Sequence, residues 1–311
     1  MARYITVGAA QSGPVSRSET RADVVAKLIE QLREAHAGDC DLVVFTECAL
    51  TAFFPHWFME DQDEIDDYFE REMPSAATQP LFDEAARLQI GFHLGFAELA
   101  DLDGVTHRYN SSVLVGKDGQ IIGKFRKIHL PGHADFRPDN PYQNLEKLYF
   151  EVGDLGFQTW RAMGGVIGMC VCNDRRWPET YRVLGLRGAE MILLGYNTPD
   201  CHPEHPELDR LANFHNQLSM QAGAYQNGCW VVGVAKAGVE EGVSQIGQTS
   251  IIAPSGEVVA MTSTCGDELI IHRCDLDATK TYKEHIFNFA RNRRIEHYGP
   301  ITNQTAATFP E

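Results

Sequence analysis

Asp41-Leu42-Val43-Val44-Phe45-Thr46 is a short apolar run led by an acidic residue, and Glu190-Met191-Ile192-Leu193 resembles it in the second half of the chain. Short continuous apolar runs are typical of strands buried on both faces. Each run follows a helical pattern, which covers residues 18–39 in the first half and 177–189 in the second. The repeated order predicts two similar sheets. Coincidence is the alternative, because helix–strand units are common in α/β chains.

Two hairpins extend the similarity between the halves. Residues 111–124 carry Lys117-Asp118-Gly119 at their turn, and residues 249–261 carry Pro254-Ser255-Gly256. Glycine at such positions is typical of tight turns. Together with the helices, the two sheets predict an α+β fold built in layers. Further strands are expected at residues 4–10, 90–97, 166–172 and 230–235, and further helices at residues 79–88 and 211–226.

The composition is that of a globular chain and excludes several classes of protein. The 311 residues are 43% hydrophobic and 23% charged, so a disordered or collagen-like chain is excluded. The net charge is −16 and no basic run occurs, which argues against nucleic acid or an anionic membrane as the main partner. No segment approaches the roughly 18 apolar residues of a membrane span. The first residues lack the apolar region of a signal peptide, so we expect a cytoplasmic protein.

The chain has no low-complexity linker, so we expect one domain over residues 1–311. The apolar pattern fades after Asp275, and we expect the tail from about residue 276 to take part in oligomer contacts. Eight cysteines are present. In a long chain without a secretion signal, we expect buried thiols rather than disulfides, with one of them reactive.

Glu47 and Lys127 are two candidates for chemistry, because each directly follows a predicted strand or hairpin. Burial of Glu47 after an apolar run would raise its pKa toward that of a general base. A helix cap or a salt bridge is the ordinary alternative. Lys127 stands in a run with Lys124 and Arg126, and such runs usually form a solvated face. The functional interpretation requires one lysine to point inward.

Cys172 is the candidate nucleophile and ends an apolar strand. Arg175 and Arg176 follow it, and nearby cations favour a thiolate. The backbone N–H just after the nucleophile, that of Asn173, is suited to hold an oxyanion. The alternatives are an inert buried thiol and a Cys-x-Cys metal site with Cys170. That metal site would lack a second pair of ligands at the usual spacing.

Glu47, Lys127 and Cys172, in this order along the chain and with the neighbouring residues quoted below, resemble the catalytic residues of the nitrilase superfamily, the carbon–nitrogen hydrolases. The similarity extends from about Tyr4 to Tyr298. Within the superfamily, the chain is most similar to the N-carbamoyl-D-amino acid amidohydrolases (D-carbamoylases). The stretches that carry this similarity are Val44-Phe45-Thr46-Glu47, Ala52-Phe53-Phe54-Pro55, Lys124-Phe125-Arg126-Lys127-Ile128-His129-Leu130-Pro131-Gly132-His133, Cys172-Asn173-Asp174-Arg175-Arg176-Trp177-Pro178-Glu179, Gly195-Tyr196-Asn197-Thr198-Pro199, Ser219-Met220-Gln221-Ala222-Gly223 and Glu284-His285-Ile286-Phe287-Asn288-Phe289.

The resemblance implies a four-layer α-β-β-α sandwich, usually paired into homodimers or homotetramers. It implies that Glu47 takes the proton of the Cys172 thiol, which attacks the carbamoyl carbon of an N-carbamoyl-D-amino acid. Lys127 would stabilise the oxyanion, and Glu146 would position Lys127 or the water. The products would be the D-amino acid, CO2 and ammonia, formed through a carbamoyl-thioester. No metal or cofactor is expected, because a thiol, a base and a cation already cover the chemistry.

A small N-carbamoyl amino acid carries a carboxylate that needs a cation. Arg175 and Arg176 are the candidates, since arginine binds carboxylates through paired hydrogen bonds. We favour Arg176 as the closer ligand, and a surface ion pair is the alternative for either residue. The other residues expected to line the site are Asn173, Asn197, Thr198, His129 and Asn144.

Three positions depart from the D-carbamoylase pattern. Thr46 stands where the family commonly has Pro, Cys48 replaces an aliphatic residue, and Asn144 replaces a His near Glu146. Asn forms hydrogen bonds but cannot carry a proton near neutral pH. We therefore expect the change at position 144 to affect substrate range or efficiency rather than the class of reaction.

Other functions remain as alternatives. A β-ureidopropionase-like enzyme, an aliphatic amidase or a nitrilase would use the same chemistry with a different pocket. A catalytically idle member that acts as a binding subunit would not need all three reactive groups. A thiol-redox protein would use Cys170 and Cys172 and would release no ammonia.

Overall fold

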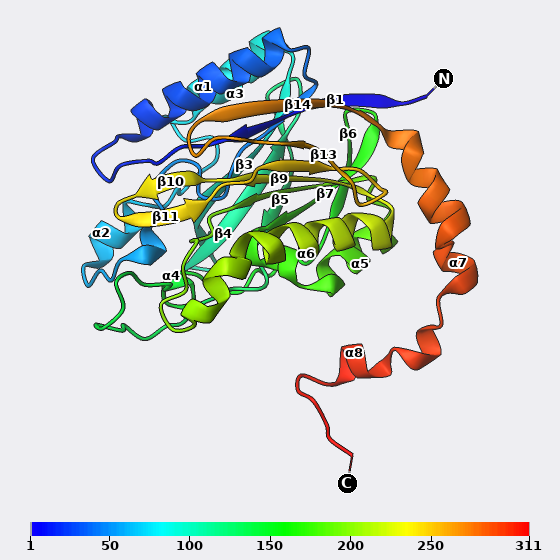
Figure 1. Cartoon of the computed structure of the whole chain (residues 1–311). Coiled ribbons are helices and arrows are strands. Elements are labelled where there is room, and N and C mark those ends of the chain that lie inside the picture. Colours follow the sequence, from blue (N-terminus) through cyan, green and yellow to red (C-terminus); the bar gives the residue numbers. More distant parts are fainter. Residues whose placement is uncertain (1, 311) are drawn as a thin grey trace.

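The computed structural model describes residues 2–310, and two six-stranded sheets form its centre (Figure 1). The first sheet has the order β14 (Glu268–Asp275), β1 (Tyr4–Gln11), β2 (Leu42–Val44), β3 (Gly91–Leu102), β4 (Val105–Val115) and β5 (Ile121–Arg126). The second has the order β6 (Thr159–Ala162), β7 (Gly165–Val171), β8 (Met191–Tyr196), β9 (Trp230–Ala235), β12 (Ser250–Ile252) and β13 (Val258–Met261). In both sheets an antiparallel edge strand, three parallel strands and an antiparallel pair follow one another. The predicted repeat of the two halves is therefore confirmed.

The acidic residue before each short apolar strand makes the same contacts in both halves. Asp41 accepts a hydrogen bond from the N–H of Thr6 at 2.9 Å, and Glu190 accepts one from the N–H of Val166 at 3.0 Å. The backbone N–H of each acidic residue returns a bond to the same partner's carbonyl. These bonds fix where β2 begins beside β1, and where β8 begins beside β7.

Helices cover the outer faces of the two sheets and complete the predicted four layers (Figure 1). On the first sheet lie α1 (Arg21–Ala37) and α3 (Gln79–Leu88), and on the second lie α5 (Pro178–Leu186) and α6 (Ala212–Asn227). Helix α1 begins at a reciprocal cap between Thr20 and Asp23, which satisfies two backbone N–H groups. The inner faces of both sheets share one apolar core, so α+β in layers is confirmed.

Several elements differ from the sequence-based expectation. The strands β6 and β14, and the hairpin of β10 (Ala237–Glu240) and β11 (Val243–Ile246), were not expected. The predicted strand 166–172 ends at Val171, so Cys172 lies just beyond it rather than within it. Strand β2 likewise ends at Val44, which places Glu47 in a loop three residues later. Both reactive side chains therefore belong to turns, where the strand alternation no longer governs their direction.

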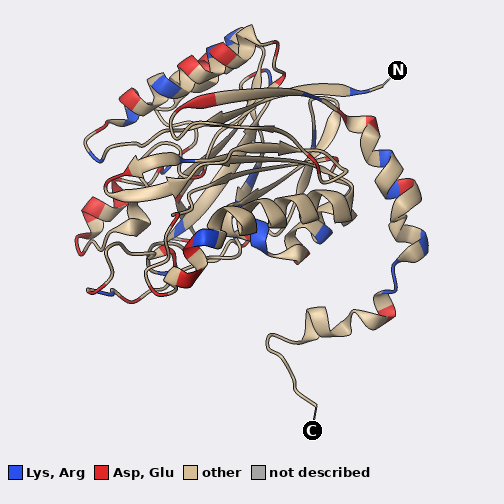
Figure 2. Ribbon diagram, viewed as in Figure 1, with Lys and Arg blue, Asp and Glu red and all other residues tan. Residues whose placement is uncertain are grey.

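The end of the chain leaves the body as an arm (Figure 1). Its helices are short, α7 (Phe289–Asn292) and α8 (Gly299–Asn303), and most of its side chains are exposed. Two other short helices, α2 (Gln62–Asp66) and α4 (Glu146–Tyr149), contribute Ile65 and Tyr149 to a separate apolar cluster of the body. Figure 2 shows Lys and Arg interspersed with Asp and Glu along α1 and along the arm. Among the described helices, none combines the length and the apolar character needed to cross a membrane.

Candidate active site

The turn after β7 presents the thiol of Cys172. Cys172 has a φ of +47°, a left-handed backbone that L-residues other than Gly rarely adopt. A short 3₁₀ helix over Cys172–Arg176 follows at once. The buried carboxylate of Asp174 accepts the N–H of Val171 at 3.1 Å and so closes the turn. The sulfur points away from the strand and lies 3.6 Å from the carbonyl oxygen of Asn197.

The backbone of Glu47 passes between the two sheets at two glycines. A Cβ on Gly95 of β3 would lie 2.7 Å from the Glu47 Cα, and a Cβ on Gly195 of β8 would lie 2.2 Å from its N. No side chain fits at either position. Asn197 donates to Glu47 Oε2 through its backbone N–H at 2.8 Å, and Asn110 donates to Oε1 at 2.7 Å. The carboxylate is therefore fixed by groups from both sheets.

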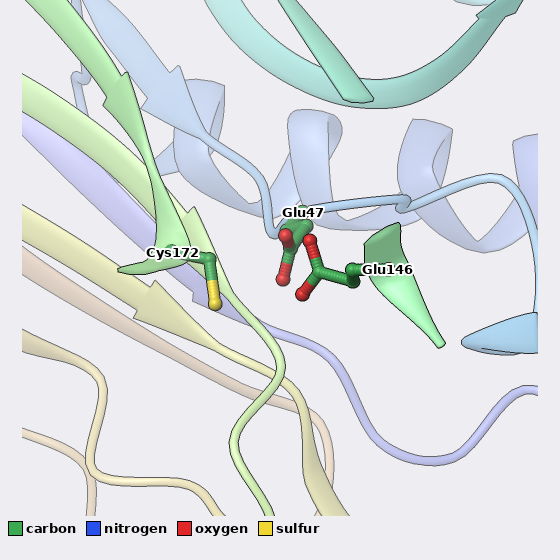
Figure 3. A group of neighbouring side chains, drawn as sticks. All are labelled: Glu47, Glu146 and Cys172. Carbon is green, nitrogen blue, oxygen red and sulfur yellow. The ribbon is translucent and has the colours of Figure 1, made fainter. Parts of the chain in front are cut away.

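Lys127 directly follows β5 and points inward, as the functional interpretation requires. Its Nζ lies 2.8 Å from Glu47 Oε1 and 2.5 Å from Glu146 Oε2, and all three side chains are buried. The oxygens of the two carboxylates and the sulfur of Cys172 lie within 4.8 Å of one another. Figure 3 shows the side chains of Glu47, Glu146 and Cys172 turned toward one space. The structure thus brings together the four residues predicted to be catalytic.

Burial and charge shift the pKa values of this group in different directions. Burial alone would raise the pKa of Glu47, but the charge of Lys127 and hydrogen bonds from Asn197 and Asn110 outweigh it and lower that pKa. Burial raises the pKa of Glu146 to about 7, although Lys127 opposes the shift. Burial would lower the pKa of Lys127, yet the surrounding negative charges raise it well above its usual value. Glu47 and Lys127 therefore form a buried ion pair at neutral pH.

The thiol of Cys172 remains protonated in the resting site. Burial and the charge of Glu47 raise the pKa of Cys172 to about 12, although Lys127 and Arg175 oppose the shift. Arg175 therefore acts in the expected direction, but burial and the charge of Glu47 outweigh it. The carboxylate of Glu47 lies within 4.8 Å of the sulfur and is placed to accept the thiol proton.

Two carboxylates and a thiolate are also a possible set of metal ligands. In this structure the ammonium of Lys127 lies against both carboxylates. It already supplies the positive charge that a cation would bring. The residues therefore fit an arrangement in which the lysine, rather than a metal, balances the site.

A cavity of about 530 Å³ leads from the surface to Cys172 and Glu146. Six of the seven residues predicted to bind substrate line it: Asn144, Asn173, Arg175, Arg176, Asn197 and Thr198. The seventh, His129, is not among the residues that line the cavity in the described chain. Its N–H and its Nδ1 both contact Asp174, and its ring stacks on Trp177 at 4.8 Å. His129 therefore supports the turn that carries Cys172.

The two arginines after Cys172 have different surroundings. Arg175 is buried, and its guanidinium donates to the Cys172 carbonyl at 2.7 Å, to Asn216 and to Thr198. It also lies over the ring of Tyr196 at 4.3 Å. Arg176 is exposed along the cavity wall. Arg175 therefore holds the turn in place, while the guanidinium of Arg176 remains available to a ligand.

Several site residues escaped the sequence analysis. Asn110 and Gly95 lie in no stretch that points to a site, and Gly195 lies in a stretch quoted for its family resemblance but was not singled out. His56 and Tyr142 line the cavity, and their rings contact each other edge to face at 5.3 Å. His56 follows a stretch already quoted for its family resemblance, and that position was the one available signal.

A thiol, an ionised carboxylate and a buried ammonium lie together at the bottom of a cavity, and these are the groups that thiol-dependent hydrolysis requires. The carbon-nitrogen hydrolase family model matches residues 6–284, so the chain belongs to the carbon–nitrogen hydrolase family of the nitrilase superfamily. It is an amidohydrolase that acts on C–N bonds.

Known proteins are similar to the chain over 63% to 98% of its length. N-carbamoylputrescine amidase of Arabidopsis thaliana is 31% identical over 290 residues, which is 88% of both chains. Citrullinase of Francisella tularensis is 29% identical over 63% of this chain and 66% of its own. The crystal structure of a carbon-nitrogen hydrolase from Helicobacter pylori has a TM-score of 0.81 at 24% identity, covering 98% of this chain and all of the other. The names of the two sequence relatives point to different substrates, and the solved structure shows the same fold.

Proposed function

We propose that the protein hydrolyses the carbamoyl C–N bond of N-carbamoyl amino acids, with Cys172 as the nucleophile. The observation that carries the proposal is Arg176, which lines the cavity four residues after Cys172 and has no ion-pair or hydrogen-bond partner within residues 2–310. A free guanidinium at this place suits a carboxylate, which it can bind through two parallel hydrogen bonds. In an N-carbamoyl α-amino acid the carboxylate lies two bonds from the reacting nitrogen.

A second polar atom supports recognition of the carbamoyl group. The Oδ1 of Asn197 is buried without a hydrogen-bond partner in the described chain, while its Nδ2 donates to Glu47. Buried acceptors without partners are costly, so a ligand with an N–H donor is favoured there. The carbamoyl NH2 is such a donor, and a nitrile has none. This favours amide and ureido substrates over nitriles.

The first half of the proposed reaction forms a covalent intermediate. Glu47 takes the proton of the Cys172 thiol as the sulfur attacks the carbamoyl carbon. The oxyanion faces the ammonium of Lys127 and the backbone N–H of Asn173. Glu47 then gives its proton to the leaving nitrogen, the C–N bond breaks, and the free amino acid departs. A carbamoyl-thioester remains on Cys172.

The second half releases the carbamoyl group. Glu47 takes a proton from water, and the hydroxide attacks the thioester carbon. The C–S bond breaks, and the proton on Glu47 returns to the sulfur of Cys172. The carbamate that leaves decays to CO2 and ammonia. Glu146 positions Lys127 throughout, because its carboxylate holds the other side of the ammonium.

The resemblance to D-carbamoylases favours the D configuration. A second candidate is an N-carbamoyl amine, the class to which the substrate named for the Arabidopsis relative belongs. Three acidic side chains at the outer part of the cavity favour a cationic end: Asp200, Glu204 and Asp209. Arg176 opposes it, because a cation near the nucleophile would be repelled.

The test is ammonia release from N-carbamoyl-D-phenylalanine, N-carbamoyl-L-phenylalanine, N-carbamoyl-β-alanine and N-carbamoylputrescine. We expect turnover of the D form, and we expect Arg176→Ala to reduce kcat/KM for that substrate by about 10²-fold. Arg187→Ala, which removes an exposed arginine at the end of α5, is the matched control and leaves activity unchanged. Turnover of N-carbamoylputrescine alone would favour the second candidate. Equal losses on charged and neutral substrates would remove Arg176 from the carboxylate site.

A further inference from the structure

A second buried ion pair lies outside the reactive group. Lys236 follows β9 directly, and Glu240 ends β10. The Nζ of Lys236 lies 2.7 Å from Oε2 of Glu240, and both side chains are fully buried. Neither residue lines the cavity within the described chain, so the pair makes no direct contact with a substrate there.

The pair holds three backbone groups from two other segments. Lys236 Nζ donates to the carbonyl of Thr51 at 2.9 Å. Glu240 accepts the N–H of Phe53 at 2.6 Å through Oε1, and the N–H of Val15 at 2.8 Å through Oε2. The two charged side chains therefore fix the turn over residues 51–53 and tie it to the segment after β1.

That turn is the far end of the loop that carries Glu47. The near end is fixed to β3, because Ala49 donates to the Gly95 carbonyl at 2.8 Å. A turn then runs from Cys48 to Thr51, closed by a backbone bond of 3.3 Å. Cys48 itself has a left-handed φ of +44°. The loop is thus attached at two points, Ala49 and the 51–53 turn, and both follow the strained residue Cys48, which is next to Glu47.

The same turn also sets one wall of the cavity. Phe53 lines the cavity, and its ring contacts His56 edge to face at 4.9 Å. His56 in turn contacts Tyr142. Burial, with a contribution from Lys236, lowers the pKa of His56 to about 3, so this wall remains uncharged at neutral pH.

Stability alone is a poor explanation for such a pair. A buried ion pair often contributes no more than well-packed apolar residues of the same volume, because both ions lose their hydration. What apolar residues would not supply is the set of hydrogen bonds to the three backbone groups, which would then be buried without partners. The charged groups of the pair are therefore suited to fixing these three backbone groups in position.

We propose that Lys236 and Glu240 are positioning residues for the reaction, which fix the 51–53 turn and through it the carboxylate of Glu47 and the Phe53 wall. The proposal rests on the role of Glu47 in the proposed function. According to the proposal, the position of Glu47 also depends on the junction of β9 with the β10–β11 hairpin. Misplacement of a reacting group by about 1 Å can cost about 10²-fold in rate.

The test is the charge-balanced double variant Lys236→Met/Glu240→Gln. It keeps side-chain volume, leaves no unpaired buried charge, and removes the donor to Thr51. We expect folded protein with a kcat lowered by about tenfold or more, and acrylamide alkylation of Cys172 slowed by a similar factor. Alkylation is read by mass spectrometry and needs no substrate. It therefore reports on the base even if the chain turns over no carbamoyl amino acid, an outcome that would count only against the proposed function.

The matched control neutralises an ion pair in the outer helix layer. Arg33 on α1 contacts Glu84 on α3 at 2.6 Å. Both helices belong to the outer layer on the first sheet and do not line the cavity within the described chain. We expect Arg33→Met/Glu84→Gln to leave kcat and the alkylation rate unchanged. Wild-type kcat and alkylation rate in a folded Lys236→Met/Glu240→Gln protein would overturn the proposal.

A second pair of variants decides the question if the double variant does not fold. Phe53→Pro and Phe53→Ala both remove the ring, but only the proline also removes the N–H that Glu240 accepts. The φ of Phe53 is −77°, which proline can adopt. We expect the proline variant to be slower than the alanine variant by about tenfold in kcat. Equal kcat values would overturn the proposal.

Discussion

Lys127 and Glu47 form an ion pair with an Nζ–Oε1 distance of 2.8 Å, and neither side chain has any exposed surface. The two residues are 80 positions apart, yet the end of β5 and the loop after β2 bring them together. Glu146 lies on the other side of the same ammonium. One cation therefore faces two carboxylates, and the two carboxylates cannot have the same affinity for a proton.

The first prediction concerns the pH dependence of stability at Glu146. Burial raises its pKa from 4.5 to about 7, so between these values the folded chain holds a proton that the unfolded chain releases. The contribution of this site to the free energy of unfolding therefore falls as pH rises through that window, by up to about 1 kcal/mol per pH unit. Glu146→Gln abolishes this dependence. Urea unfolding from pH 5 to 7.5 should show the variant gaining on the wild type as pH rises, and a constant difference would contradict it.

The second prediction separates the two neighbouring thiols. Cys172→Ala should abolish turnover and leave the circular dichroism spectrum unchanged, since the thiol forms the covalent bond. Cys170→Ala is the matched control, because Cys170 is buried within β7 as part of the apolar core. It should keep near wild-type kcat and lose roughly 1 kcal/mol of stability. Wild-type activity in Cys172→Ala would show that Cys172 is not the nucleophile.

The fold could be predicted because its strongest signals are local. The runs at 41–46 and 190–193 are continuous apolar stretches that contain the strand β2 and the start of β8, and the helix over residues 79–88 has its predicted bounds. Strand β14 is mostly half-exposed, so its alternation is weak, and it joins the first sheet only through pairing with β1. The hairpin of β10 and β11 has four-residue strands, which are too short for a pattern. Elements of this kind depend on tertiary contacts that no local window contains.

The candidate site could be predicted only where a reactive side chain ends a patterned element. Lys127 is one such case, although two neighbouring cations obscured it. Lys236 and Glu240 are the opposite case, because a Lys and a Glu four residues apart usually indicate a solvated face. Their full burial depends on the meeting of β1, β9 and the Glu47 loop. The sequence analysis favoured Arg176 over Arg175 as the carboxylate ligand, but the burial of Arg175 depends on tertiary contacts of the same kind.

The third prediction concerns the close approach of the two sheets at Gly195. An added Cβ would lie 2.2 Å from the N of Glu47, and its three nearest atoms, from Glu47 and Thr46, are all backbone atoms. Gly195→Ala should therefore move Glu47, lowering kcat by about 10²-fold and stability by about 1–3 kcal/mol. Gly266→Ala is the control, since its Cβ would meet no described atom within 4 Å. An unchanged kcat in Gly195→Ala would contradict the prediction and show that the reaction does not depend on this position of Glu47.

The last prediction concerns the C-terminal arm, which we propose packs on a second copy of the chain. The arm leaves Ile295, Ile301 and Phe309 exposed by 70%, 59% and 85%. On the body, Phe214 and Leu218 of α6 are exposed by 57% and 49%. Burying a large apolar side chain contributes roughly 1.5–3 kcal/mol, so several such contacts between two copies would hold a dimer together.

Ending the chain at Asn288 should therefore shift the sedimentation equilibrium toward monomer while the body remains folded. Phe214→Ser/Leu218→Ser in the full-length chain should weaken the assembly in the same direction, because it alters the proposed partner surface without shortening the arm. Val239→Ser, at an exposed position on β10, is the control for a lost surface side chain and should leave the mass unchanged. If both the shortened chain and the α6 variant keep the wild-type mass at micromolar concentration, the arm has no part in assembly.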